Sequence, residues 1–241
     1  MNRCSSGGND LDAEKAPFMS RYLMFFLFCL LAYAGAQTAS VEHSLEPLSG
    51  KKAPSIESKT TLVMSTELGD VTIEVYPEAA PHAAERFVEL AESGFFDNTA
   101  VSRMVSGFVA QFGINWREPH RQWKEKTFDD DPTYFALKRG TVAFAKAGLN
   151  TNSTQVFINL RDNSYLASPE YNFTVFGRVV DGMEIVDQFA MVGDPQGGLD
   201  QGRLWRNGGE YLDSLGMKPT MILSVKKQEE KAGKDSESED G

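Results

Sequence analysis

The first part of the globular region alternates apolar and polar residues. Val71, Ile73 and Val75 occupy every second position and are separated by polar residues, which is the period of a β-strand with one buried face. A second strand-like run precedes this one, and the two meet at Gly69. We therefore predict a β-hairpin over Thr61–Tyr76.

The pattern then changes to the period of a helix. Pro77 and Pro81 bracket a turn, and from 82 to 93 apolar residues recur three or four positions apart until Gly94. Glycine is common just after the end of a helix. The stretch is predicted to form one amphipathic helix, and the same spacing predicts a second helix over Gly182–Met191.

The remaining apolar segments are short and are separated by turn residues. The predicted strands are Thr99–Val105, Gly107–Phe112, Thr141–Ala145, Val156–Leu160, Thr174–Val180 and Met221–Val225. Many short strands with few helices indicate a mainly β fold whose sheet is closed or nearly closed.

Two segments without a clear period are predicted to be long loops. They are Asn115–Pro132 and Gly193–Leu215, and loops of such length are more often functional rims or insertions than core. Trp116 and Trp123 lie in the first of them. Two interpretations stay open: these tryptophans form a surface for a partner, or they fold back on the domain.

An apolar run lies near the N-terminus, outside the predicted domain. Tyr22–Ala36 follows Arg21 and ends in small residues, as in a secretory signal peptide. The run is shorter than the about 20 residues of a usual membrane span. Residues 1–36 are predicted to be a cleaved signal peptide, which places the protein in the secretory pathway or outside the cell. An uncleaved signal anchor, giving a single-pass membrane protein, is the alternative.

Composition sets the other domain boundaries. Residues 37–58 contain Ser, Pro, Lys and Glu without periodicity, and residues 228–241 form a charged tail. Segments of this composition do not bury enough apolar surface to fold. We therefore predict a flexible linker over 37–58, a folded domain over 59–227 and a disordered tail over 228–241.

Charge and cysteine content argue against several classes of function. The chain of 241 residues carries a formal net charge of −10, which repels phosphate, so no nucleic-acid partner is expected. Cys4 and Cys29 precede the domain, and His43, His82 and His120 are far apart in the sequence. We expect no disulfide framework, thiol nucleophile, metal site or cofactor in the domain.

Three motifs carry a family resemblance. They are R-x-x-x-G-F-x-x-Q from Arg103, G-T-V-A-F-A-x-A-G-x-N-T-N-S-T-Q-x-F-I from Gly140, and Y-N-F-T-V-F-G-R-V-V-D-G-M from Tyr171. In this order they resemble the cyclophilins, the cyclosporin-binding peptidyl-prolyl cis/trans isomerases, over about Thr61–Lys227. The resemblance implies a closed eight-stranded antiparallel β-barrel capped by two α-helices, with the substrate groove on its outer wall.

The same resemblance implies an enzyme that acts on X–Pro bonds in polypeptides, whose rotation barrier is about 20 kcal/mol. Arg103 would donate to the proline nitrogen of the twisted amide and Gln111 would position that arginine, so these two are the implied catalytic residues. The implied substrate-binding residues are Phe108, Val109, Ala145, Lys146, Ala147, Gln155, Phe157, Tyr165, Leu166 and Phe173.

Several residues depart from the common cyclophilin pattern. Ser102 precedes the arginine where a histidine is usual, Val109 replaces a methionine, and Lys146 replaces an asparagine or, in bacterial-type members, an arginine. Tyr165 stands where cyclosporin-sensitive members have tryptophan, so the indole donor is missing. We expect weak or no cyclosporin binding, and the chain resembles the bacterial-type branch more closely.

Two hypotheses for the function follow. In the first, the chain is a monomeric isomerase that assists protein folding in the secretory pathway. In the second, it is a low-activity module that binds proline-containing peptides or a protein partner. In both, any membrane attachment is through the N-terminal segment. Glycosylation sequons begin at Asn152 and Asn172, and Asn172, in a predicted loop, is the better acceptor.

Overall fold

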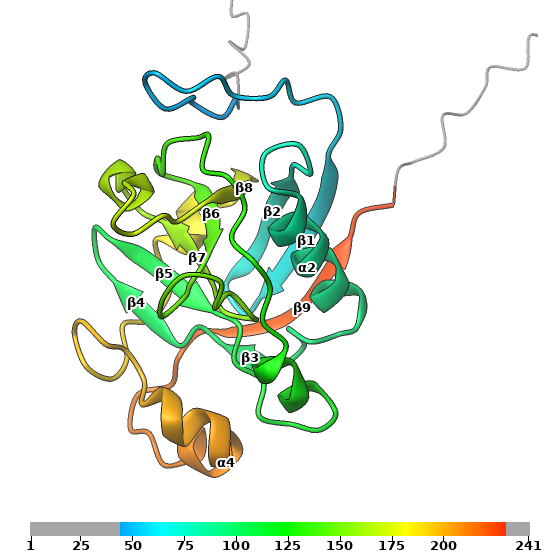
Figure 1. Ribbon diagram of the computed structural model, residues 1–241. Coiled ribbons are helices and arrows are strands. Elements are labelled where there is room, and N and C mark those ends of the chain that lie inside the picture. The colour runs from blue at the N-terminus through cyan, green and yellow to red at the C-terminus, as the bar shows by residue number, and fades with distance from the viewer. Residues whose placement is uncertain (1–43, 230–241) are drawn as a thin grey trace, which may run out of the picture. The chain divides into compact units, whose positions relative to one another are not determined.

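The computed structural model describes residues 44–229 of the chain (Figure 1). The described residues all belong to one compact unit. The predicted signal or anchor segment 1–36 and the tail from residue 230 onward lie outside the described residues. Within residues 44–229, no helix is both long and apolar enough to cross a membrane.

Nine antiparallel strands of the described unit form one curled sheet. Along the chain they are β1 (Thr60–Thr66), β2 (Gly69–Val75), β3 (Thr99–Ala100), β4 (Arg103–Val105), β5 (Val109–Phe112), β6 (Thr141–Phe144), β7 (Val156–Asn159), β8 (Val175–Asp181) and β9 (Met221–Lys227). Their order across the sheet is β3-β9-β1-β2-β8-β6-β7-β5-β4. The predicted hairpin is confirmed, since β1 and β2 pair along their whole length.

The sheet of residues 44–229 is open, with β3 and β4 at its two edges, so the predicted closed eight-stranded barrel is wrong. Both edges come from the single strand predicted over Thr99–Val105. This strand is interrupted where the Val101 N–H donates to the Thr220 carbonyl and the Ser102 N–H donates to the Gln111 carbonyl. The chain leaves one edge and joins the other at this point, and the sheet curls to bring its edges side by side.

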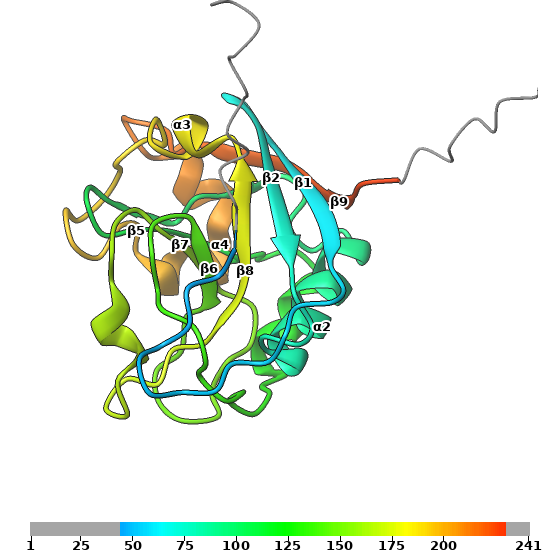
Figure 2. The same ribbon diagram turned by 90° about the horizontal axis from the view of Figure 1, so that it is seen from above.

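Three α-helices and two 3-10 helices lie around the sheet within residues 44–229. They are α2 (Pro81–Glu92), α3 (Met183–Val186), α4 (Gln201–Asp213), η2 (His120–Glu125) and η3 (Ser164–Ala167). α2 packs against β8 and β9 (Figure 2), and its buried Phe87 and Leu90 join the main core. The first predicted helix is confirmed, whereas the second is reduced to the short helix α3.

The predicted loop Gly193–Leu215 contains α4, a helix that was not predicted from the sequence. Gly202, Gly208 and Gly209 lie in this helix, and a glycine costs about 1 kcal/mol relative to alanine in a helix interior. The buried residues of α4 are Leu204, Trp205, Gly208, Tyr211 and Leu212. Their spacing is the helical signal that the glycines obscured. The helix bends at Asn207, whose φ of −148° and ψ of 50° are not helical.

The two predicted loops pack against one another. The ring of Trp116 lies so close to Gly208 that a Cβ added to the glycine would come within 2.3 Å of it. Trp116 and Trp123 are both partly buried against the main core. Of the two interpretations of the segment Asn115–Pro132, the structure therefore shows the one in which the tryptophans fold back on the domain.

Part of the predicted linker 37–58 also lies against the domain. Leu45 is 7 % exposed and belongs to the smaller of two hydrophobic clusters. The Leu48 N–H donates to the Tyr134 carbonyl over 2.8 Å. The folded unit therefore begins earlier in the chain than the predicted boundary at residue 59.

Candidate active site

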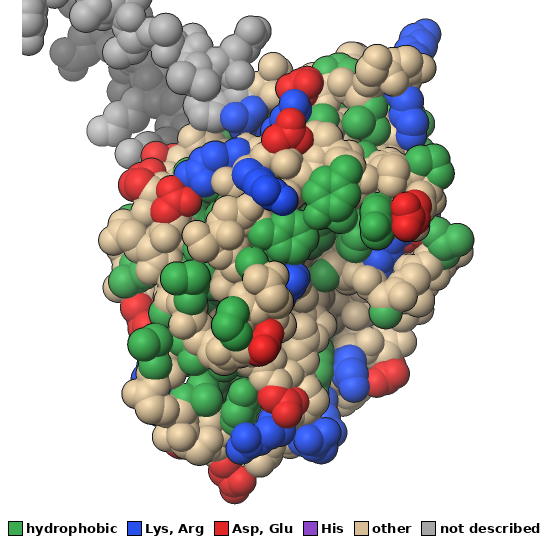
Figure 3. All heavy atoms as spheres, turned by 90° about the vertical axis from the view of Figure 1, so that its left-hand side faces the viewer, with side chains coloured by type: hydrophobic (Ala, Val, Ile, Leu, Met, Phe, Trp, Pro, Cys, Tyr) green, Lys and Arg blue, Asp and Glu red, His purple; other side chains and the backbone are tan. Residues whose placement is uncertain are grey.

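A groove of about 380 Å³ is lined by residues of β4, β5 and β7 and of the connections beside them. Figure 3 shows hydrophobic side chains gathered on the face that lies to the left in Figure 1, where β4 and β5 run. Of the predicted site residues, the groove lining contains Arg103, Phe108, Val109, Gln111, Ala145, Lys146, Ala147, Gln155, Phe157, Leu166 and Phe173. Thr151, Ser153 and Gln201 line it too, although they were not predicted from the sequence.

Strand pairing places three of these residues in one row. Arg103 of β4 pairs with Gln111 of β5, and Gln111 pairs with Phe157 of β7. Residues directly opposite one another in an antiparallel pair point to the same face of the sheet. The register therefore brings a cation, an amide and an aromatic ring together on the groove face.

The guanidinium of Arg103 is held by neighbours on several sides. Its Nε donates to the Gln196 carbonyl over 2.6 Å, and its Nη1 donates to Gln111 Oε1 over 3.3 Å. Its central carbon lies 5.5 Å from the centre of the Phe108 ring, within the range of a cation–π contact. Burial lowers the pKa of Arg103 from its ordinary value, yet arginine stays charged in proteins. A permanent cation is therefore fixed beside an aromatic wall.

Three glutamines continue from Arg103 along the groove. Gln111 Nε2 donates to Gln155 Oε1 over 2.9 Å, and Gln155 Nε2 donates to Gln201 Oε1 over 3.2 Å. A guanidinium has donors only, so Gln111 turns its oxygen toward Arg103 and its nitrogen toward Gln155. The orientation of each amide then follows from the one before it. Gln201, the first residue of α4, is the last member of this chain of amides.

Another part of the groove is apolar. The rings of Phe157 and Phe173 meet edge to face, with their centres 5.5 Å apart. Val109 and Leu166 are buried in the same cluster. Burial of an apolar group of the size of a proline ring in such a pocket is worth about 1.5–3 kcal/mol.

Tyr165 is the predicted site residue that does not line the groove. It is 50 % exposed, and its ring meets that of Tyr171 edge to face at 6.0 Å. Tyr165 belongs to η3, the helix that also carries Leu166 of the groove lining, and both tyrosines are exposed.

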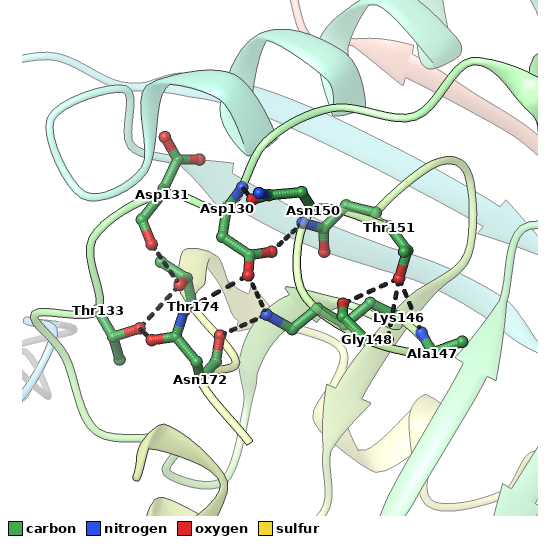
Figure 4. A network of polar contacts seen from close by, with 11 residues as sticks. Asp130, Asp131, Thr133, Lys146, Ala147, Gly148, Asn150, Thr151, Asn172 and Thr174 are labelled. Atoms are coloured by element: carbon green, nitrogen blue, oxygen red, sulfur yellow. Dashed lines mark hydrogen bonds and ion pairs between the residues drawn. The ribbon is translucent and has the colours of Figure 1, made fainter. Parts of the chain in front are cut away.

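The side chain of Lys146 is held inside the wall of the groove (Figure 4). Its Nζ lies 2.6 Å from Asp130 Oδ2 and donates to the Asn172 carbonyl over 2.9 Å. The side chains of Lys146 and Asp130 are only 4 % and 9 % exposed. Burial by itself raises the pKa of Asp130, but hydrogen bonds from Lys146 and Asn152 outweigh it, and the net pKa lies below its ordinary value.

The predicted substrate-binding residues Ala145, Lys146 and Ala147 include one whose main chain is unpaired. The Ala145 N–H donates to the Gln155 carbonyl, and the Ala147 N–H donates to Thr151 Oγ1. Within residues 44–229, the N–H and carbonyl of Lys146 have no such partner. The main chain of Lys146 is therefore the place where an extended peptide can add through backbone hydrogen bonds.

Groups for other kinds of chemistry do not meet in the groove. His82 lies 3.3 Å from Asp131, and the ring of His120 meets that of Phe95 edge to face; neither histidine lines the groove. His43 lies outside the described residues. Among residues 44–229, no cluster of His, Cys, Asp and Glu is arranged to hold a metal ion.

The asparagines of the two glycosylation sequons differ in exposure, since Asn152 is buried and Asn172 is partly exposed. Asn152 Nδ2 donates to Asp130 Oδ1 over 2.7 Å, and Asn172 Nδ2 lies 3.5 Å from Asp130 Oδ2. Asn172 Oδ1 also accepts from Thr133 Oγ1 over 3.0 Å. A glycan on either nitrogen would disrupt these contacts. Asn152 is the more buried of the two, and glycosylation at Asn172 stays a prediction.

Comparison with known proteins decides the family. The model of the cyclophilin type peptidyl-prolyl cis-trans isomerase/CLD family matches residues 61–201, which is more than half of the chain and includes every residue that lines the groove. The chain belongs to the cyclophilins. The match ends at Gln201, so most of α4 lies beyond it.

Curated relatives carry the same activity in their names. The peptidyl-prolyl cis-trans isomerase-like 3 protein of Rhizopus delemar is 35 % identical over 134 residues, which cover 52 % of this chain and 77 % of that protein. The human protein of the same name is 33 % identical over 132 residues, covering 53 % and 80 %. Family membership and these relatives assign this cyclophilin the activity of a peptidyl-prolyl cis/trans isomerase.

Solved structures agree with the mainly β cyclophilin fold. The crystal structure of a cyclophilin type peptidyl-prolyl cis-trans isomerase of Cryptosporidium parvum has a TM-score of 0.53 at 20 % identity, and covers 72 % of this chain and 99 % of that one. The structure of that protein in the presence of the dipeptide Ala-Pro has a TM-score of 0.51 at 20 % identity, with 70 % and 99 % covered. At this identity the likeness shows the fold alone.

Proposed function

We propose that this cyclophilin accelerates rotation about X–Pro bonds by holding the proline in the groove and stabilising the twisted amide with Arg103. The observation that carries this proposal is the guanidinium fixed by Gln111 and Gln196 beside the ring of Phe108. In a twisted amide resonance is lost and the lone pair is localised on the proline nitrogen. A permanent donor at that nitrogen favours the twisted state over both planar ones.

The other groove residues act on the two sides of the bond. We assign the proline ring to the apolar pocket around Phe157 and Phe173, and the residues before the proline to the main chain of Lys146. Main-chain pairing accepts many sequences. The proposed substrates are therefore proline-containing polypeptides of varied sequence, bound by a monomer of the bacterial-type branch.

The test is the cis-to-trans conversion of a short X–Pro peptide. We expect Arg103→Ala to lower kcat/KM about a hundredfold, the usual order for one donor to a transition state. Arg121→Ala removes an exposed arginine of η2 and should leave the rate unchanged. Wild-type protein no faster than solvent, or Arg103→Ala equal to wild type, defeats the proposal. Peptide binding without acceleration would leave the alternative function, a low-activity binding module.

We further propose that the protein assists folding in the secretory pathway. The support is the apolar run Tyr22–Ala36 with its flanking Arg21 and its small-residue end. The mass of the exported protein tests it: an N-terminus at Gln37 supports a cleaved signal peptide, and an intact N-terminus held in the membrane supports the signal anchor. A chain that stays inside the producing cell and off the membrane contradicts both.

A further inference from the structure

The segment Asp194–Gln201 contacts the Arg103 system at two places. The Gln196 carbonyl accepts from Arg103 Nε over 2.6 Å. Gln201 ends the chain of amides that begins at Arg103 Nη1 and passes through Gln111 and Gln155. The two contacts hold different nitrogens of the guanidinium, because one acts on Nε directly and the other on Nη1 through the glutamines.

The turn within this segment is closed by its own hydrogen bonds. Asp194 Oδ1 accepts the N–H groups of Gln196 and Gly197 over 2.9 and 2.7 Å. The main chains of Asp194 and Gly198 bond in both directions over 2.7 and 2.8 Å. The hydrogen bonds from Gly197 and Gln196 also lower the pKa of the Asp194 carboxyl. The Gln196 carbonyl is thus held at a fixed place in a closed turn.

Gly198 allows this turn to lie directly on β4. Its φ is +75°, and an added Cβ would come within 2.5 Å of the Ser102 carbonyl oxygen and 2.6 Å of Arg103 Cα. The next residue, Leu199, donates its N–H to the Ser102 carbonyl over 2.8 Å. A side chain at position 198 would therefore push the turn away from Arg103.

The far end of the segment leads into a helix that is docked on the domain. α4 begins at Gln201 and is capped by Asp200, whose Oδ1 accepts from the Arg203 N–H over 2.8 Å. Its Gly208 lies against the ring of Trp116. Tyr211 Oη accepts the Asp200 N–H over 2.9 Å. The segment is therefore tied to the fold at its far end as well as at β4.

We propose that Asp194–Gln201 is a positioning element for Arg103, acting through the Gln196 carbonyl and the Gln201 side chain. The proposal rests on the proposed role of Arg103. A guanidinium carries five N–H donors, and among residues 44–229 its acceptors are found at Nε and Nη1. Holding these two nitrogens fixes the plane of the group, so the remaining donors face the substrate in one orientation.

The central experiment compares Gly198→Ala with Gly216→Ala in the isomerase assay. Gly216 lies after α4 with nothing within 4 Å of an added Cβ, so it is the matched control. We expect Gly198→Ala to lower kcat/KM about tenfold, with most of the loss in kcat, because a hydrogen bond to a charged group is lost. Gly216→Ala should match wild type.

A double-mutant cycle shows whether the effect passes through Arg103. Lysine lacks the Nε–H that the Gln196 carbonyl accepts. In an Arg103→Lys background, Gly198→Ala should therefore lower kcat/KM by less than about twofold. The same loss in both backgrounds overturns the proposal.

Two further measurements serve if Gly198→Ala does not fold. In wild-type protein the Arg103 Nε–H should exchange slowly with water by NMR, and fast exchange overturns the proposal. At the other contact, Gln201→Met loses the acceptor for Gln155 and should lower kcat about threefold, whereas Gln201→Glu keeps an acceptor oxygen and should retain the rate. Equal rates for the two variants overturn the role of Gln201.

The outcomes separate this proposal from the proposed function. If Arg103→Ala is inactive while Gly198→Ala equals Gly216→Ala, the positioning element is overturned and the role of Arg103 stands. If Arg103→Ala retains full activity, the role of Arg103 itself falls.

Discussion

Lys146 and Asp130 form an ion pair inside the wall of the groove, with Nζ 2.6 Å from the carboxylate and with 4 % and 9 % of the two side chains exposed. Asn152 contacts the same carboxylate, and so does Asn172 (Figure 4). A buried charge is tolerated only while its partner is present. The pair therefore ties the segment before Asp131 to the residues that follow β6 at the edge of the groove.

Removing the lysine should destabilise the fold. We expect Lys146→Met to lower the free energy of unfolding at pH 7 by about 3 kcal/mol, because Asp130 is left buried without a countercharge. The matched control is Lys138→Met, which breaks an ion pair with Asp162 on the surface and should change little. Urea unfolding measures both. If the variant that carries both Asp130→Asn and Lys146→Met loses as much unfolding free energy as Lys146→Met alone, lost packing rather than the unpaired charge is the cause.

The same pair predicts how stability depends on pH. The pKa of Asp130 in the folded protein lies below its ordinary value of 3.8. The contribution of the Asp130 carboxylate to stability is therefore complete above that value and is lost as the pH falls through the folded pKa. In Lys146→Met the favourable bond from the ammonium is gone and burial favours the protonated acid. The difference in unfolding free energy between wild type and Lys146→Met should therefore shrink between pH 7 and pH 3. A difference that grows over this range contradicts the assignment.

The contact between α4 and Trp116 predicts that alanine substitutions at two adjacent glycines have opposite effects on stability. A Cβ on Gly208 would come within 2.3 Å of the Trp116 ring, whereas one on Gly209 approaches it no closer than 3.8 Å. Gly208→Ala should cost about 2 kcal/mol of unfolding free energy through overpacking. Gly209→Ala should be neutral or stabilise by up to about 1 kcal/mol through helix propensity. Thermal unfolding of the two variants checks this, and equal melting temperatures would show that the contact is not tight.

Cyclosporin binding should be weak and should respond to position 165. Tyr165 supplies no indole N–H, and Tyr165→Trp restores one where cyclosporin-sensitive members carry it by resemblance. We expect that variant to bind cyclosporin about tenfold more tightly than wild type. Tyr171→Trp places an indole at the neighbouring position, whose ring contacts that of Tyr165, and serves as the control. A titration in which the wild type binds with nanomolar affinity would refute the prediction.

Local patterns predicted most of the strands and the first helix. The alternation around Ile73 and the helical spacing of 82–93 depend only on which face of each element is buried, so they can be read within one segment. The same reading missed α4, where glycines masked a helical apolar face. It also treated Thr99–Val105 as one strand, because an interruption at Val101 depends on partners from β5 and from the residues before β9.

By itself the sequence determined the family, most of the strand pattern and most of the residues that meet in the groove, since motif order and spacing carry that information along one chain. Only the tertiary structure decided how those residues are held. The Gln196 carbonyl lies 93 positions from Arg103, and Lys146 lies 16 positions from Asp130. Such partners are chosen by the way separate segments pack, because a hydrogen bond or buried ion pair depends on distance in space and not on spacing in sequence.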